Sequence, residues 1–231
     1  MSIETLLDGI TNIKGGFSGY RRPELEQQLR QLTPDKRIVF AAAIAERIMP
    51  QYRRFCRETG QGNLDFLRHT LNWLWDDILE RKLPDQFIED LRDQCEALIP
   101  GDDAIWVEAT AYAQDAVGAI YCVLSSRITG DIADTIGAAQ FICDTIYDSI
   151  MRRVDVDLRK SDWYEIVLND PVMQQELARQ SRDAVQLGQN DITPRIVQRI
   201  RRRARLESRT VLLIPARRPK RRSRAGGSSP G

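Results

Sequence analysis

The sequence predicts an all-α protein, folded as a single bundle of about seven or eight helices with a disordered basic C-terminal tail. Apolar side chains recur every three or four residues through most of the 231-residue chain, which is the period of an amphipathic helix. Residues that favour helix starts, often followed by proline, precede many of these stretches. A strand-like pattern occurs only in the short stretch 209–215. Hydrophobic residues make up 42% of the chain, enough for one large core.

The N-terminal segment, residues 1–32, is expected to hold a short amphipathic helix followed by a flexible linker. Apolar residues between positions 3 and 10 have helical spacing, and the glycine-rich stretch 15–23 is typical of a connection. Its glycines are not followed by the G-K-[ST] of a phosphate-binding loop, so no nucleotide site is predicted there.

A helical domain is assigned to residues 33–208, and its first helix has clear boundary signals. Thr33 is a good N-cap and Pro34 suits the first helical position. Pro50 should kink or split this helix, because proline lacks the N–H donor and crowds the preceding turn. Gly60 is a natural stop.

Similar signals delimit the helices that follow. The segment 103–130 is rich in alanine and glycine, so neighbours can approach it closely and we place it at the centre of the fold. A helix over 131–158 and a short helical or irregular element over 161–171 come next. The other expected boundary residues are Asn63, Pro84, Asp170 with Pro171, Gly188, and Thr193 with Pro194.

The net charge of +1 conceals a strong asymmetry. From Arg195 onward the chain has 13 of its 34 basic residues and one of its 33 acidic residues, which leaves 21 basic and 32 acidic residues before it. An acidic body therefore carries a basic end. The last segment, 209–231, is rich in arginine and poor in apolar residues, so it is expected to be disordered.

Most standard catalytic arrangements find no support. His69, in the stretch HTLNWLWDDI, is the only histidine, and neither a paired E-x-x-H motif nor H-E-x-x-H is present. A G-x-S-x-G elbow is also absent. We therefore interpret His69 as structural or exposed, and we predict neither a cofactor-binding residue nor a metal site.

Three aspartates are the candidates for chemistry, although no catalytic residue is firmly assigned. Asp115 lies in the least polar surroundings of any acid, so it needs a partner if its helix is central. Asp144 and Asp148 are spaced i,i+4 and share a helix face. They could hold a divalent cation together with another helix, or they could be ordinary salt-bridged surface groups.

The basic end is the strongest functional signal. Arginine-rich segments bind nucleic-acid phosphates or anionic membrane surfaces, but a solubilising tail or one that folds back onto the acidic body would have the same composition. The helix after Thr193 has one apolar stripe, so it can dock while its arginines stay in water. The candidate polyanion-binding residues are Arg201, Arg202, Arg203, Arg217, Arg218, Arg221 and Arg222.

Several features favour a cytoplasmic location. No apolar run approaches the length of a membrane span, and the N-terminus lacks the pattern of a secretory signal. The four cysteines contain no C-x-x-C pair, so we expect four buried, reduced thiols and not a metal site. They are Cys56, Cys95, Cys122 and Cys143.

Several blocks of the chain resemble the YjaG-like family of bacterial proteins, a domain family of unknown function. The most specific blocks are ERIMPQYRRFCRETGQGN (46–63) and the acidic turn IPGDD (99–103), and the resemblance extends over about 33–208. It implies an all-helical cytoplasmic bacterial protein and supplies no activity, cofactor or catalytic residue. The N-terminal thirty residues and the arginine-rich terminus depart from the pattern.

The leading functional hypothesis is a non-enzymatic helical protein that acts through contacts with another protein or with itself. Two alternatives stay open. One is an accessory protein that binds a polyanion or nucleic acid through its arginine-rich C-terminus. The other is a metal-dependent enzyme built on carboxylates.

Overall fold

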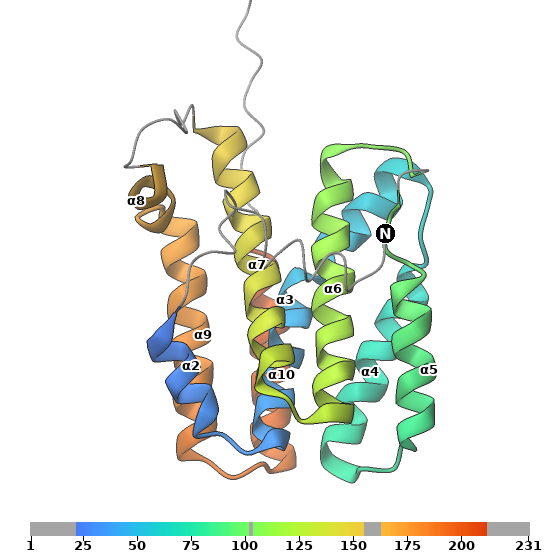
Figure 1. Cartoon of the computed structure of the whole chain (residues 1–231), viewed down its shortest axis with the longest axis vertical. Coiled ribbons are helices and arrows are strands. Elements are labelled where there is room, and N and C mark those ends of the chain that lie inside the picture. The colour runs from blue at the N-terminus through green and yellow to red at the C-terminus, as the bar shows by residue number, and fades with distance from the viewer. Residues whose placement is uncertain (1–21, 102–103, 155–162, 212–231) are drawn as a thin grey trace, which may run out of the picture.

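A computed structural model of the chain describes residues 22–101, 104–154 and 163–211 (Figure 1). This part of the chain forms nine helices and contains no strand, which confirms the all-α prediction with one or two helices more than expected. The helices are α2 (Pro23–Arg30), α3 (Pro34–Thr59), α4 (Leu64–Glu80), α5 (Asp85–Glu96), α6 (Glu108–Thr129), α7 (Ile132–Arg153), α8 (Trp163–Leu168), α9 (Pro171–Gln189) and α10 (Pro194–Glu207).

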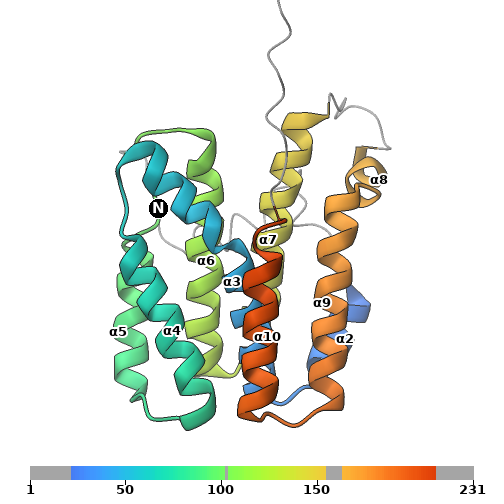
Figure 2. The same cartoon turned by 180° about the vertical axis from the view of Figure 1, so that it is seen from behind.

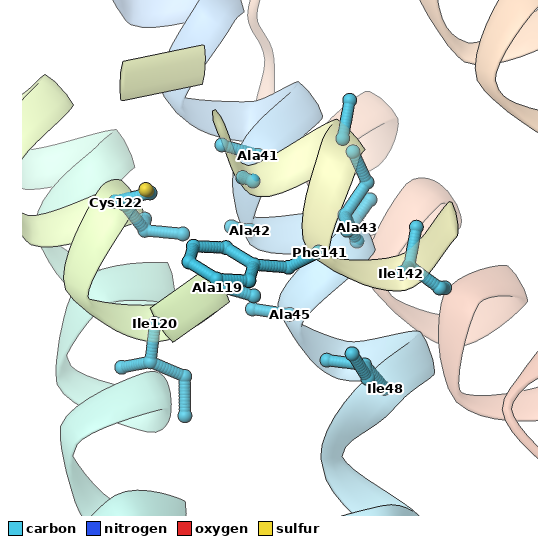
Figure 3. Close-up of a cluster of buried hydrophobic side chains, with 14 of the residues drawn as sticks. Ala41, Ala42, Ala43, Ala45, Ile48, Ala119, Ile120, Cys122, Phe141 and Ile142 are labelled. Atoms are coloured by element: carbon cyan, nitrogen blue, oxygen red, sulfur yellow. The ribbon is translucent and has the colours of Figure 1, made fainter. Parts of the chain in front are cut away.

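Helix α3 is the centre of the bundle. It packs against α4, α6, α7, α9 and α10, and every residue from Ile38 to Met49 is buried. Figure 1 shows α4 and α5 on one side of α6, and α8 and α9 on the other side of α7. The alanine-rich helix α6, which we expected at the centre, does lie beside α3, but α3 contacts more of its neighbours. Alanines at 41–43 and 45 let these helices approach closely (Figure 3).

The boundaries of α3 are as predicted, whereas its middle is not split. Pro34 is the first helical residue, and Gly60 ends the helix in the left-handed conformation with φ 71°. The helix is continuous through Pro50. Because proline has no N–H, the carbonyl of Glu46 lacks its usual helical donor one turn earlier.

The predicted caps of the later helices are mostly confirmed. The side chains of Asn63, Asp170 and Thr193 each accept a hydrogen bond from a backbone N–H in the first turn that follows. Helix α6 begins five residues later than predicted, because Thr110 Oγ1 accepts the N–H of Val107 (3.0 Å) and closes the first turn there.

The two ends of the described chain contribute to the core. Helix α2, which was not predicted from the sequence, packs on α9 and buries Leu25 and Leu29, and Leu32 in the turn that follows is buried too. At the other end Val211 is fully buried, although residues from 209 onward were expected to be disordered. Residues 1–21 and 212–231, where the N-terminal helix and most of the tail were predicted, lie outside the described part.

The four cysteines are free, but only three are buried. Cys95, Cys122 and Cys143 lie in the core, whereas Cys56 is partly exposed, contrary to the expectation for all four. Burial raises the pKa of the Cys95 and Cys143 thiols to about 12. No described helix is both long and apolar enough to cross a membrane.

Helices α6 and α7 meet at a glycine that has no room for a side chain. A Cβ placed on Gly118 would lie 2.5 Å from Cζ of Phe141, whose ring is buried against the alanines of α3 (Figure 3). Gly188, near the end of α9, would place its Cβ 3.9 Å from Leu32, which is an ordinary contact.

We predict that Gly118→Ala lowers the free energy of unfolding by about 1–3 kcal/mol, because the methyl group overpacks a rigid helix contact. Gly188→Ala is the matched control and should be neutral or stabilising by up to about 1 kcal/mol, since alanine favours the helix. Urea denaturation of both variants measures the difference. Equal effects would contradict the close α6–α7 contact.

Candidate functional site

Helix α10 lies against α3 through one apolar stripe. Val197, Ile200 and Ala204 are buried, as the spacing in the sequence predicted. Figure 2 shows α10 in front of α3, between α4 and α9. This docking brings the arginines of α10 next to a pair of charged residues in the middle of α3.

Glu46 connects α3 to both α4 and α10. Its carboxylate is fully buried and accepts hydrogen bonds from Arg68 Nη1 of α4 (2.7 Å) and Arg205 Nε of α10 (3.2 Å). Arg201 Nε lies 3.5 Å from the same carboxylate, and its guanidinium carbon lies 5.7 Å from the ring centroid of Trp75. Burial and the neighbouring Arg205 lower the pKa of Arg201. One acid is therefore shared by three arginines.

Arg47, the next residue, connects α3 to α9 and α10. It is completely buried and donates to Asp183 Oδ2 (2.7 Å) and twice to Glu176 Oε1 (2.9 and 3.1 Å). A third carboxylate, Glu207 Oε2, lies 3.7 Å away. Burial opposes ionisation of Arg47, but Glu176 and Asp183 outweigh it and raise the pKa of the guanidinium. Arg47 therefore stays charged in the core.

A cleft opens between α3, α4 and α10 beside Glu46. Its volume is about 600 Å³. Of the nine described residues that line it, four are arginines and one is acidic. The lining residues are Glu46, Pro50, Gln51, Arg53, Arg68, Asn72, Arg205, Ser208 and Arg209.

Two of these arginines have no counter-ion among the described residues. Arg53 on α3 and Arg209 after α10 are exposed, and neither makes an ion pair within the described ranges. The cleft also contains a buried amide, Gln51, whose Oε1 has no hydrogen-bond partner in the described chain. The arrangement is suited to an anion, because guanidinium groups match the geometry of phosphate and carboxylate oxygens.

The structure changes the interpretation of the predicted polyanion-binding residues. Arg201 and Arg203 do not stay in water as expected: Arg203 donates to Asp183 (2.6 Å) and Gln186 (2.7 Å) on α9. Arg202 is exposed but does not line the cleft. The remaining candidates, Arg217, Arg218, Arg221 and Arg222, lie outside the described residues.

The cleft residues on α3 and α4 were missed by the sequence analysis. One signal could have found them, because Glu46 and Arg47 interrupt the otherwise apolar run AAAIAERIM. Charges in such a stretch require partners from other helices. The spacing of Arg205 and Arg209, one turn apart, would then have placed both on the face beside Glu46.

The three predicted aspartates come together between α6 and α7. Asp115 Oδ2 accepts a hydrogen bond from Thr145 Oγ1 (2.6 Å), and Asp144 Oδ1 accepts one from Gln140 Nε2 (2.9 Å). Burial and the nearby Asp144 raise the pKa of Asp115 well above its usual value, whereas Arg152 partly offsets the rise for Asp148. The carboxylates therefore repel one another.

This acidic cluster has no assigned chemistry. Across the described ranges, no group of three or more His, Cys, Asp or Glu side chains is arranged to hold a metal ion. A catalytic role for Asp115, Asp144 and Asp148 stays a prediction. His69 is exposed and lies against the ring of Trp73, with centroids 6.1 Å apart.

Comparison with known proteins places the chain among proteins of unknown function. Residues 24–211 match the family described as "Protein of unknown function (DUF416)". The protein named "Uncharacterized protein YjaG" of Escherichia coli K12 is 28% identical over 104 residues, which are 45% of this chain and 53% of that protein. Its namesake in Salmonella typhimurium is 27% identical over the same length. The aligned part thus spans about half of these relatives.

A solved structure is similar over most of the fold. The crystal structure of a DUF416 family protein from Shewanella baltica aligns with a TM-score of 0.71 and 25% sequence identity. The alignment covers 78% of this chain and 92% of that one. The resemblance inferred from sequence blocks is confirmed, and the matched region begins nine residues earlier than the predicted start at 33.

We predict that the acidic cluster makes stability depend on pH. Burial, with a smaller contribution from Asp148, raises the pKa of Asp144 to about 7 although Gln140 opposes the rise. The folded protein therefore keeps a proton that the unfolded chain releases near about pH 4. The free energy of unfolding should accordingly fall as pH rises from about 4 to 7, and Asp115, whose pKa is also raised, adds to this fall.

Asp144→Asn should reduce this fall, leaving the part that Asp115 contributes, and should raise stability above pH 7 by about 1–2 kcal/mol, after allowance for partial exposure. Urea denaturation at several pH values measures it. Asp191→Asn, at an exposed loop position, should leave the wild-type profile unchanged. An Asp144→Asn profile parallel to the wild type would show that Asp144 ionises normally.

Proposed function

Because this chain belongs to the DUF416 family of proteins of unknown function, its own side chains are the guide to its activity, and we propose that it binds nucleic-acid phosphates in the cleft between α3, α4 and α10. The observation that carries the proposal is the charge of the cleft. Four arginines line it, and its one acid is already shared by three arginines. A phosphate could bind the guanidinium groups of Arg53 and Arg209, which form no ion pair with other described residues.

The sequence beyond the cleft supports a polymeric ligand. Six of the eight residues from 217 to 224 are Lys or Arg, and they follow Arg209 closely along the chain. The predicted polyanion-binding residues Arg217, Arg218, Arg221 and Arg222 belong to this stretch, and Arg202 is a further exposed candidate on α10. Neutralisation of several phosphates at once releases counterions, which makes such binding strong at low salt.

The composition of the cleft argues for recognition of the backbone and not of the bases. Its lining contains no aromatic side chain on which a base could stack. Gln51, Asn72 and Ser208 supply neutral hydrogen-bonding groups. We therefore expect little sequence preference. Binding of this kind requires neither a metal nor a cofactor. We propose that the protein acts in the cytoplasm.

We predict that Arg53→Ala combined with Arg209→Ala weakens binding of a fluorescent single-stranded oligonucleotide at least about tenfold, with a shallower dependence on salt. Fluorescence anisotropy on the full chain measures both. The control pairs Arg57→Ala with Arg199→Ala, two exposed arginines on α3 and α10 outside the cleft. This control removes the same amount of positive charge and should reduce oligonucleotide affinity by a smaller factor.

Inorganic pyrophosphate serves as a competitor that separates a polymeric ligand from a small one. Displacement of the oligonucleotide only at high pyrophosphate concentration is expected. If pyrophosphate binds as tightly as the oligonucleotide, the natural ligand of the cleft is a small phosphate compound and not a nucleic acid. Absence of salt-sensitive binding by the wild type, or equal losses in the two double variants, would contradict the proposal.

We propose self-association as a second candidate function, supported by one surface feature. Ile105 and Trp106, adjacent residues before α6, are 52% and 65% exposed. Large apolar side chains of this kind are concentrated at the centres of protein interfaces. Sedimentation velocity at increasing concentration should show association that Trp106→Ser removes. Wild-type sedimentation that is independent of concentration would contradict this candidate.

A further inference from the structure

The carboxylate of Glu46 binds the same arginines that a ligand phosphate in the cleft would bind, so the two would compete for them. Its buried carboxylate contacts Arg68 and Arg205 and lies beside Arg201. These arginines are only partly buried, with side-chain exposures of 27%, 48% and 21%. Arg68 and Arg205 line the cleft, so their guanidinium groups can turn toward a ligand there, whereas the carboxylate of Glu46 is enclosed by the protein.

We infer that Glu46 is a built-in counter-ion that sets the affinity and selectivity of the cleft, an inference that rests on the proposed function. Its negative charge repels an approaching anion and holds three guanidinium groups against α3. A single carboxylate of a ligand would only replace the interactions that these arginines already make with Glu46. A phosphate carries more acceptor oxygens and can also reach Arg53 and Arg209.

The neighbouring polar groups are consistent with this role. Asn72 Oδ1 accepts a hydrogen bond from Arg205 Nη2 (3.2 Å) and one from Arg201, so the arginines are held from two sides. Gln51, 5% exposed, faces the cleft with its Oε1 unpartnered by described residues. The cleft thus holds one acid among three arginines at its floor and adds Arg53 and Arg209 at its rim, which favours ligands with high charge density.

The test is the isosteric substitution Glu46→Gln in the full chain, with the oligonucleotide and poly-glutamate as probes. Loss of the internal charge should tighten oligonucleotide binding about five- to tenfold at low salt. The slope of log K against log salt should steepen by about 0.7 for each additional phosphate contact. Poly-glutamate binding should improve by a larger factor, so that the preference for phosphate falls.

Hydrogen exchange of the α10 amides shows whether α10 stays docked in the variant. If Glu46→Gln releases α10, Glu46→Asp becomes the test, because it keeps the charge while withdrawing the carboxylate from the arginines. This variant should bind more tightly than the wild type. Unchanged or weaker oligonucleotide binding by the variant in which α10 is docked overturns the inference. Failure of the proposed function looks different, because then neither wild type nor variant binds.

Discussion

Two adjacent opposite charges in the middle of the most buried helix organise one half of this protein. Glu46 and Arg47 point to different neighbours, so one residue pair fixes α4, α9 and α10 around α3. Burial of an ion costs several kcal/mol unless it is fully paired. Each therefore requires partners: Glu176 and Asp183 of α9 supply them for Arg47, and Arg68 of α4 and Arg205 of α10 supply them for Glu46. The pairing restricts how these helices can pack.

The same constraint places charge on the surface. Helix α10 has more arginines than the buried acids of the core require, so several of them, such as Arg199 and Arg202, are exposed to solvent. A group of acidic residues, Asp115, Asp144 and Asp148, lies elsewhere, on α6 and α7. Helices α6 and α7 are in front in Figure 1, whereas α4 and α10 are in front in the opposite view of Figure 2. The small net charge of the chain thus results from cancellation between separate regions.

Much of the fold was predictable from local signals, because helix boundaries depend on nearby residues. Pro34 and Gly60 were identified by the backbone conformations that they favour, and Asn63 by its cap hydrogen bond. Thr33 occupies the predicted N-cap position of α3 without a side-chain cap hydrogen bond. Helix α2 was missed because its eight residues are short of a full periodic pattern and its leucines are buried only by tertiary packing, chiefly against α9 and also against α7.

The cleft was not predictable in the same way. Arg53, Arg68 and Arg205 are far apart in the sequence, and each alone has the character of an ordinary surface residue. Only tertiary packing brings them together around Glu46. The prediction that the arginines of α10 stay in water was wrong for Arg203, because a helix docked by a narrow apolar stripe also buries the residues that flank it.

The ion pair between Arg47 and Asp183 is the most direct test of whether buried charge holds the helices together. A double-mutant cycle with Arg47→Met and Asp183→Asn, followed by urea denaturation, isolates their coupling from the other effects of each substitution. We expect a favourable coupling free energy of about 2–3 kcal/mol between Arg47 and Asp183. Additivity of the two substitutions within about 0.5 kcal/mol would mean that apolar packing alone positions α9 and α10.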